Sequence, residues 1–108
     1  MRVIGFNGSG RKDGNTAVLL KAAFKKLEEA GIETELIQLA GERIRGCRAC
    51  YKCKDLKNKQ CSIKNDCIND CIDKMDLADG MLIGSPTYFS DVSAETKALV
   101  DRAGMVAR

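Results

Sequence analysis

The sequence predicts an α/β domain built on a doubly wound parallel sheet. Short apolar segments with the character of strands alternate along the chain with amphipathic helices. This alternation is typical of βαβ units, whose parallel strands carry helices on both faces. The 108 residues suffice for one small domain, and no internal repeat or low-complexity tract divides them. We therefore interpret residues 1–108 as a single domain.

Six elements are expected, and each has a local cause. Strands are predicted over residues 2–6, 33–39 and 81–83, and helices over residues 15–30, 66–75 and 93–103. The first strand is an apolar run, and the glycine-rich turn 7–14 follows it. Leu20, Phe24 and Leu27 share one face of the first helix, and Gly31 suits its C-terminal stop.

The later elements follow from the same kind of signal. The second strand alternates polar and apolar residues, and the third is short and fully apolar. Ser93 is a good N-cap for the last helix. The middle helix has a continuous apolar face, made by Cys67, Ile68, Cys71, Ile72 and Met75. On such a face Cys67 and Cys71 behave as small hydrophobic residues, and we expect them in the core.

The predicted sheet is incomplete. Three parallel strands are fewer than such sheets usually contain, and residues 81–83 carry no lysine, proline or charge to protect an exposed edge. A partner strand is therefore expected, either from a longer chain or from another subunit. We favour a domain truncated after its third strand and the following helix.

Composition narrows the class of protein. With 44% hydrophobic and 31% charged residues, the chain is typical of soluble globular proteins, and no run has the length of a signal peptide or a membrane span. Six cysteines in such a chain indicate metal or redox chemistry in the reducing cytoplasm. The absence of histidine excludes an imidazole base or ligand.

Four cysteines form a compact ladder within an insertion at residues 46–64, hereafter the cysteine loop. They are Cys47, Cys50, Cys53 and Cys61. Soft thiolates at such close spacing suit an iron–sulfur cluster or zinc. Seven cations accompany one anion between Arg43 and Lys59, a local charge of +6. This positive charge can offset a thiolate-bound metal centre, form an anion site or simply be a solvated surface. Tyr51 is the only aromatic residue among these cations, so nucleic acid is not expected as a partner.

Three alternatives remain for the state of the four ladder cysteines. Zinc usually takes two Cys-x2-Cys pairs a dozen or more residues apart, which this ladder does not offer. The run from Cys47 to Cys53 matches the opening of bacterial ferredoxin motifs, without their x3-Cys-Pro continuation. We favour a [4Fe-4S] cluster, ahead of reduced or redox-active thiols and of zinc.

The turn after the first strand has the composition of an anion site. It lies between a strand and a helix N-terminus, where backbone N–H groups and the helix dipole favour an anion. Its pattern is neither a Rossmann fingerprint nor a Walker A loop. Side chains suited to a terminal phosphate are Ser9, Arg11, Asn15 and Thr16. The alternative is a plain turn with Asn15 or Thr16 as N-cap.

A second loop follows the third strand, at the edge where open α/β sheets bind ligands. It reads Ser85, Pro86, Thr87, Tyr88 and Phe89. These residues offer backbone N–H groups and aromatic surface for a flat ring, unless Tyr88 and Phe89 are buried under the next helix. If the first and third strands are neighbours, both loops meet at one mouth. A phosphate site beside a ring site predicts FMN.

Together, residues 8–16, residues 84–89 and the segment from Ser93 to Arg102 resemble the NAD(P)H-dependent FMN reductase branch of the flavodoxin-like proteins. The cysteine loop resembles that of the iron–sulfur flavoproteins within it, whose motif binds a [4Fe-4S] cluster. The resemblance implies a flavodoxin-like fold that continues with two more strands. It also implies that Ser9, Arg11, Asn15 and Thr16 hold the FMN phosphate and that residues 85–89 line the isoalloxazine.

The expected function is therefore that of an FMN-binding redox protein, with FMN and a [4Fe-4S] cluster as cofactors and NAD(P)H as electron donor. The protein binds and tunes the cofactors, and no side chain is assigned as a catalytic acid or base. The alternatives are a cluster-free NAD(P)H:quinone or FMN reductase, and a non-enzymatic electron carrier or zinc-binding module. The expected partner is an electron donor or acceptor, either a small molecule or a protein. Binding to nucleic acid or to a membrane is not expected, and the protein is expected to form a homo-oligomer.

Overall fold

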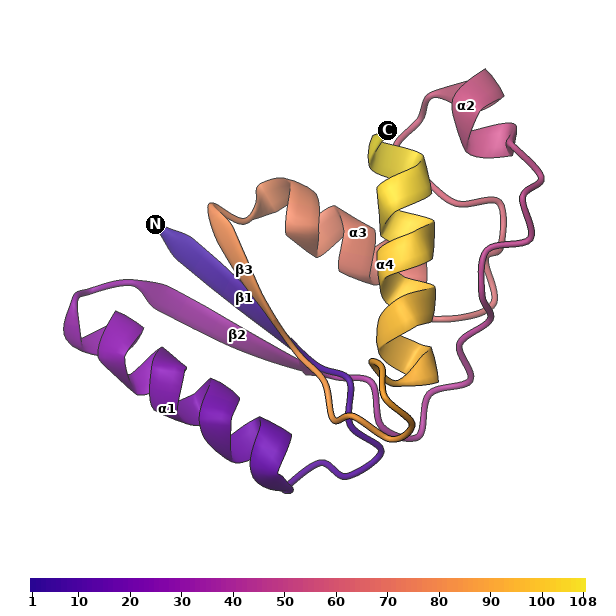
Figure 1. The fold of residues 1–108 in the computed structure, drawn as a ribbon. Coiled ribbons are helices and arrows are strands. Elements are labelled where there is room, and N and C mark those ends of the chain that lie inside the picture. The colour runs from indigo at the N-terminus through magenta and orange to yellow at the C-terminus, as the bar shows by residue number, and fades with distance from the viewer.

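The computed structural model describes residues 1–108 as a parallel sheet with helices around it (Figure 1). The strands are β1 (Arg2–Asn7), β2 (Glu33–Gln38) and β3 (Gly80–Gly84); the helices are α1 (Asn15–Glu29), α2 (Lys52–Leu56), α3 (Ile68–Leu77) and α4 (Ala94–Ala107). All strands are parallel, in the order β2-β1-β3. The α/β class and the doubly wound arrangement are thus confirmed.

Helices cover both faces of the sheet. α1 lies on one face, and α3 and α4 lie on the other (Figure 1). Because side chains alternate along a strand, Ile4 and Phe6 of β1 enter the core below α3 and α4. Gly5 faces α1, where an added Cβ would lie 2.5 Å from the ring of Phe24. The core consists of Ile4, Phe6, Leu39, Ile68, Cys71, Ile72 and Leu99.

The element boundaries differ from the predicted ones at a few ends. Ser93 is the N-cap of α4 as predicted, because its Oγ accepts the Thr96 N–H at 3.2 Å. At its other end, α4 continues four residues beyond the predicted end at residue 103. α3 begins two residues later than predicted, where Asp66 accepts the Ile68 N–H at 3.2 Å. α1 begins after Gly14, so its N-cap has no side-chain acceptor.

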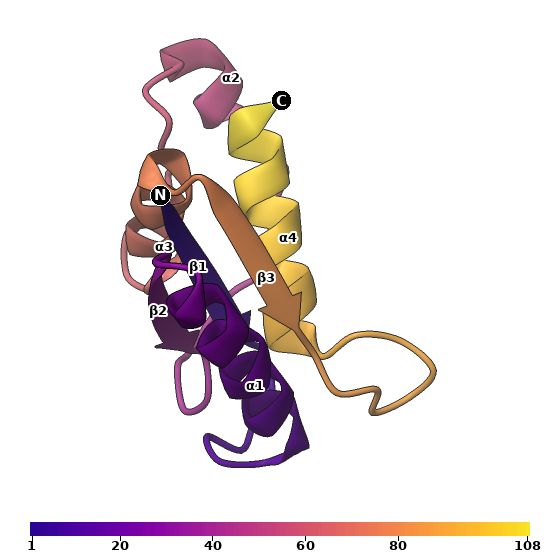
Figure 2. The same ribbon diagram turned by 90° about the vertical axis from the view of Figure 1, so that its left-hand side faces the viewer.

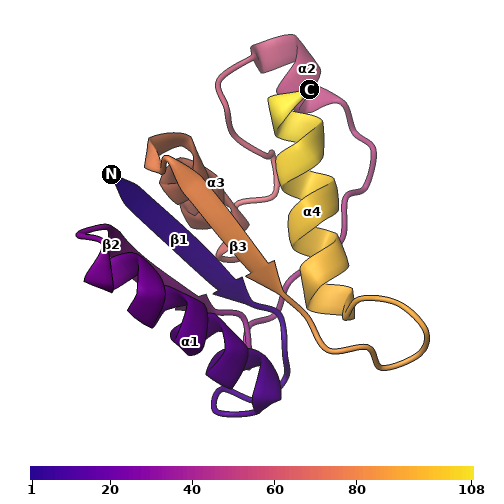
Figure 3. The same ribbon diagram turned by 60° about the vertical axis from the view of Figure 1, so that its left-hand side comes forward.

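α2, a short helix inside the cysteine loop, was not predicted. Tyr51 and Lys57 flank it in the left-handed backbone conformation, with φ of 59° and 47°. Lys54 donates to the carbonyl of Met105 at 2.7 Å, which joins α2 to the C-terminal half of α4 (Figure 3). The cysteine loop therefore lies against α4.

β3 forms one edge of the sheet, and β2 forms the other. Met81 and Ile83 of β3 are 46% and 42% exposed, so apolar side chains lie open along this edge. None of the helices combines the length and the apolar character needed to cross a membrane.

Candidate functional site

The loops after β1 and β3 meet at the carboxyl end of the sheet (Figure 3). The Gly8 N–H donates to the Gly84 carbonyl at 2.8 Å, and the Gly10 N–H donates to the Tyr88 hydroxyl at 3.0 Å. The Ser93 hydroxyl donates to the Gly8 carbonyl at 2.6 Å. These bonds confirm that the two loops form one mouth, hereafter the sheet mouth (residues 8–14 and 84–93).

Asn7, at the end of β1, organises the first loop of the mouth. Its Oδ1 accepts the Ser9 N–H at 3.0 Å, and its Nδ2 donates to the Arg11 carbonyl at 3.3 Å and to Gln38 at 2.8 Å. Ser9 is buried, and its Oγ accepts the Arg11 N–H at 3.0 Å, whereas the Arg11 side chain is exposed. Ser9 therefore shapes the loop from inside. Sequence reasoning missed Asn7, although a polar residue ending a buried strand is a usable signal.

The start of α1 offers unpaired donors to the mouth. Its first turn contains no acidic residue and no side-chain cap. The first bond of the helix ladder runs from Val18 to the Gly14 carbonyl, so the N–H groups of Asn15, Thr16 and Ala17 have no partner within the helix. These donors and the positive end of the helix suit an anion.

The loop after β3 extends beyond the sheet (Figure 2). Its base is held by Ser85, whose hydroxyl donates to the Pro86 carbonyl and accepts the Ser93 N–H, both at 2.9 Å. Tyr88 and Phe89 are 63% and 89% exposed, so the alternative in which they are buried under α4 is wrong. The exposed part of the loop includes Thr87, Tyr88 and Phe89.

The four ladder cysteines line a single cavity between the cysteine loop and α4, hereafter the cysteine cavity. The lining includes Cys47, Cys50, Cys53, Cys61, Arg48 and Arg102. No group of three or more Cys, Asp or Glu side chains is arranged to hold one metal ion. The thiols thus share a cavity without converging on a single point within it.

Three of the four sulfurs have polar neighbours. Cys47 Sγ accepts the N–H of Ala49 at 3.4 Å, and Cys61 Sγ accepts the N–H of Ile63 at 3.5 Å. The Ser62 hydroxyl lies 3.1 Å from Cys50 Sγ. This contact is the main reason that the pKa of Cys50 falls to about 7, and a backbone N–H and Arg48 add to it. The thiolate is the form that binds metal.

Cys67 and Cys71 belong to the core and not to this cavity. Cys71 is 2% exposed, and burial raises its pKa to about 12. Burial also raises the pKa of Cys67, which packs against the same core cluster. Both groups are therefore held as neutral thiols, which confirms the interpretation of the apolar face.

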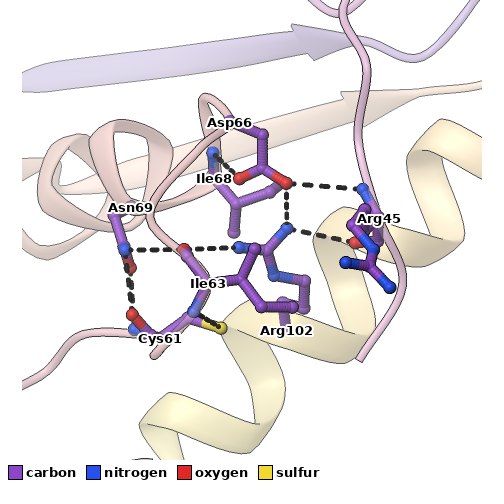
Figure 4. Close-up of polar contacts among 7 residues, drawn as sticks. All are labelled: Arg45, Cys61, Ile63, Asp66, Ile68, Asn69 and Arg102. Carbon is purple, nitrogen blue, oxygen red and sulfur yellow. Dashed lines mark hydrogen bonds and ion pairs between the residues drawn. The ribbon is translucent and has the colours of Figure 1, made fainter. Parts of the chain in front are cut away.

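A buried ion pair anchors the cysteine loop (Figure 4). Arg102 of α4 pairs with Asp66 and also donates to the carbonyls of Arg45 at 3.0 Å and Ile63 at 3.1 Å. Burial alone would raise the pKa of Asp66, but Arg102 and the N–H groups of Ile68 and Arg45 outweigh it and lower this pKa. Burial alone would lower the pKa of Arg102, but Asp66 and then Cys61 outweigh it and raise this pKa.

Asn69 of α3 fixes the segment that carries Cys61 (Figure 4). Its Oδ1 accepts the Cys61 N–H at 2.7 Å, and its Nδ2 donates to the carbonyls of Cys61 at 3.0 Å and Ile63 at 3.2 Å. Sequence reasoning missed both Asn69 and the Asp66–Arg102 pair. Asn69 and Asp70 both lie between Ile68 and Cys71 in the sequence, and only the fold shows that Asn69 is buried and Asp70 exposed.

The open parallel sheet, the anion-accepting turn after β1 and the adjoining loop after β3 define a flavodoxin-like α/β protein. A family model described as NADPH-dependent FMN reductase matches residues 1–108, and the chain belongs to this family.

Three relatives share the name iron-sulfur flavoprotein. The chain is 44% identical over 103 residues to one from Methanocaldococcus jannaschii, a match that covers 95% of this chain and 52% of the relative. It is 33% identical over 108 residues to one from Methanosarcina thermophila, covering 100% and 55%. It is 39% identical over 105 residues to one from Archaeoglobus fulgidus, covering 97% and 50%. The chain thus spans about half the length of the curated relatives it matches.

Proposed function

We propose that this chain carries the FMN site and the cysteine-bound redox site of an NAD(P)H-dependent flavin oxidoreductase. When bound, FMN supplies hydride and electron chemistry, and a [4Fe-4S] cluster supplies single-electron transfer. The observation that carries this proposal is the sheet mouth, where unpaired donors of α1 lie beside a loop with exposed aromatic side chains. The electron donor and acceptor and a homo-oligomeric state stay predictions.

The first part of the mouth suits the FMN phosphate. The N-terminal N–H groups of α1 have no side-chain cap, and the nearby residues Arg11, Asn15 and Thr16 carry a guanidinium, an amide and a hydroxyl. Ser9 contributes by holding the Arg11 backbone rather than by reaching out from the loop. A phosphate bound there would replace water at donors that are already fixed in direction.

The second part suits the isoalloxazine ring. Ser85 and Pro86 hold the base of the loop, and Thr87, Tyr88 and Phe89 present polar and aromatic surface beyond it. Aromatic side chains bind flat rings by offset stacking. The Tyr88 hydroxyl, bonded to the Gly10 N–H, joins the ring side to the phosphate side of the same mouth.

The cysteine cavity suits a cluster better than a single zinc ion. Zinc needs four ligands at about 2.0–2.3 Å from one point, and no such group exists here. In a [4Fe-4S] cluster each cysteine binds a different iron, so the sulfurs lie further apart around a shared volume. Four thiols around one cavity, with Arg48 and Arg102 in its lining, support this proposal.

A second candidate is a cluster-free reductase with redox-active thiols. It is favoured by Cys50, which is exposed and has a pKa lowered to about 7, so that its thiolate is well populated at neutral pH. Anaerobic purification and a visible spectrum separate the two candidates. Flavin bands above a broad brown absorbance support the cluster, and flavin bands alone support the thiols.

The phosphate assignment is tested by titrating the flavin-free protein with FMN and with riboflavin, which lacks the phosphate. FMN should bind at least tenfold more tightly. Arg11→Ala should weaken FMN binding by about 10- to 100-fold, as expected for one charged hydrogen bond, and leave riboflavin binding unchanged. Lys12→Ala is the matched control, because it removes a neighbouring exposed cation.

Two results would contradict the FMN site. One is equal affinity for FMN and riboflavin, and the other is an equal effect of the Arg11 and Lys12 substitutions. NADPH oxidation, measured with and without added FMN, then separates a reductase from an electron carrier: a carrier would not turn over NADPH in either case.

A further inference from the structure

Arg102 is the one charged residue among the largest fully buried side chains of this protein. It is 1% exposed. A buried guanidinium is tolerated only where its charge and its N–H groups find partners. Asp66 supplies the opposite charge, and the carbonyls of Arg45 and Ile63 accept from the two terminal nitrogens (Figure 4).

One N–H of this guanidinium has no partner. Arg102 Nε is the only buried side-chain nitrogen or oxygen in the protein that lacks a hydrogen bond. A buried donor left unpaired costs about 1–3 kcal/mol, and more when it is charged. Because the other nitrogens hold the loop, this one is free to serve a bound group.

The position of Arg102 indicates what that group is. Arg102 lines the cysteine cavity together with all four ladder cysteines. The thiol of Cys61 is close enough to interact with the guanidinium, and its sulfur accepts the Ile63 N–H at 3.5 Å. The lining of the cavity is dominated by sulfur and apolar atoms, so a bound acceptor for Nε–H would be a sulfur of the metal–thiolate group.

We propose that Arg102 donates its Nε–H to a sulfur atom of the cluster bound by the four cysteines, and that its buried charge raises the reduction potential of that cluster. This inference rests on the proposed function of the cysteine cavity. Reduction by one electron adds one negative charge to the cluster, and a fixed cation and N–H donor stabilise that form more than the oxidised one.

Arg48 provides the internal comparison. It lines the same cavity, but it is exposed, and it donates to the Ser62 hydroxyl at 3.2 Å. Water and salt screen an exposed charge far more than a buried one. If the effect of an arginine on the reduction potential of the cluster depends on its burial, removal of Arg48 must shift this potential less than removal of Arg102.

The test is a reductive titration with dithionite of the iron-loaded protein, followed by electron paramagnetic resonance. The main variant is the double substitution Asp66→Asn with Arg102→Met, which removes the ion pair as a unit so that no buried charge is left alone. In this variant the ratio of oxidised to reduced cluster at a given potential should rise at least tenfold. For a one-electron couple this corresponds to a midpoint potential about 59 mV lower. Arg48→Met should shift less.

Arg102→Lys is the second variant, because it keeps a cation but lacks the Nε–H. It can be measured even if the double variant does not fold. Its midpoint should fall by a smaller amount than that of the double variant. An unchanged midpoint in either iron-loaded variant, or equal shifts for the Arg48 and Arg102 substitutions, would overturn the inference and leave the proposed function intact. A wild-type protein without iron and sulfide would overturn both.

Discussion

The sheet mouth and the cysteine loop are held in different ways. In the mouth, Gly8 bonds to Gly84 through the backbone, and the loops continue strands that are themselves paired. The cysteine loop, residues 46–64, has one buried residue, Ile63. It contains four of the five non-glycine residues with positive φ in the chain, namely Ala49, Tyr51, Lys57 and Lys59.

The difference concerns what each region needs in order to fold. The mouth follows from strand pairing, so its donors are in place before any ligand arrives. The cysteine loop is anchored from outside, by the Asp66–Arg102 pair and by Asn69, while its left-handed residues cost energy. We infer that a bound metal group completes this loop, so that metal binding and local folding are coupled there.

The largest expected effect comes from breaking the anchor. Asp66→Asn leaves the buried guanidinium of Arg102 without its counter-charge, and the free energy of unfolding should fall by about 3–5 kcal/mol. Urea unfolding measures this loss. Asp101→Asn is the matched control, because Asp101 pairs with Lys97 at the surface at 2.6 Å, and exposed pairs of this kind contribute little to stability.

The same pair predicts an acid dependence. The pKa of Asp66 is lowered in the folded protein, so its stabilising contribution is present above the ordinary aspartate pKa and is lost as pH falls through the lowered value. As the pH falls, the free energy of unfolding of the wild type should therefore decrease more than that of Asp66→Asn, which lacks the titrating carboxylate. Parallel stability curves for the two proteins below pH 5 would contradict this account.

A smaller effect is expected at the mouth, where the two loops approach most closely. An added Cβ at Gly8 would lie 1.8 Å from the Thr96 hydroxyl, so Gly8→Ala should cost about 1–3 kcal/mol and weaken FMN binding. At Gly10 the nearest atom to an added Cβ is 3.5 Å away, an ordinary contact. Gly10→Ala is thus the control; if both variants bind FMN equally well, the mouth is less tightly built than we describe.

The smallest effect concerns the strain of the cysteine loop. Ala49 has φ of 55°, a conformation that glycine adopts freely, so Ala49→Gly should stabilise the metal-free loop by up to about 1 kcal/mol. Amide hydrogen exchange over residues 46–64 measures this change. Ala30→Gly, at φ of −89°, should show no gain. Faster exchange in Ala49→Gly would show that the left-handed residues carry no strain.

The sequence predicted the mouth well because its geometry follows from chain order. Parallel strands separated by helices bring the ends of β1 and β3 together, whatever the side chains are. The anchor of the cysteine loop could not be predicted in this way. Asp66 and Arg102 are 36 residues apart, and their pairing depends on how α3 and α4 pack on the sheet.

The exposed state of Tyr88 and Phe89 was also beyond the sequence pattern. Aromatic residues after a strand are compatible with a buried turn and with a binding loop, and only the path of the chain through Ser85 and Ser93 decides between them. α2 escaped prediction because five residues between left-handed positions leave no periodic signal. Local patterns thus predicted the elements, and tertiary contacts determined the details of both sites.

The most direct test of two separately built sites is the iron, acid-labile sulfide and FMN content of the anaerobically purified protein, compared with its Cys61→Ser variant. We expect about four irons, about four sulfides and one FMN per chain in wild type. Cys61→Ser should lose iron and sulfide and keep its FMN. Zinc in place of iron and sulfide, or loss of FMN together with the cluster, would contradict it.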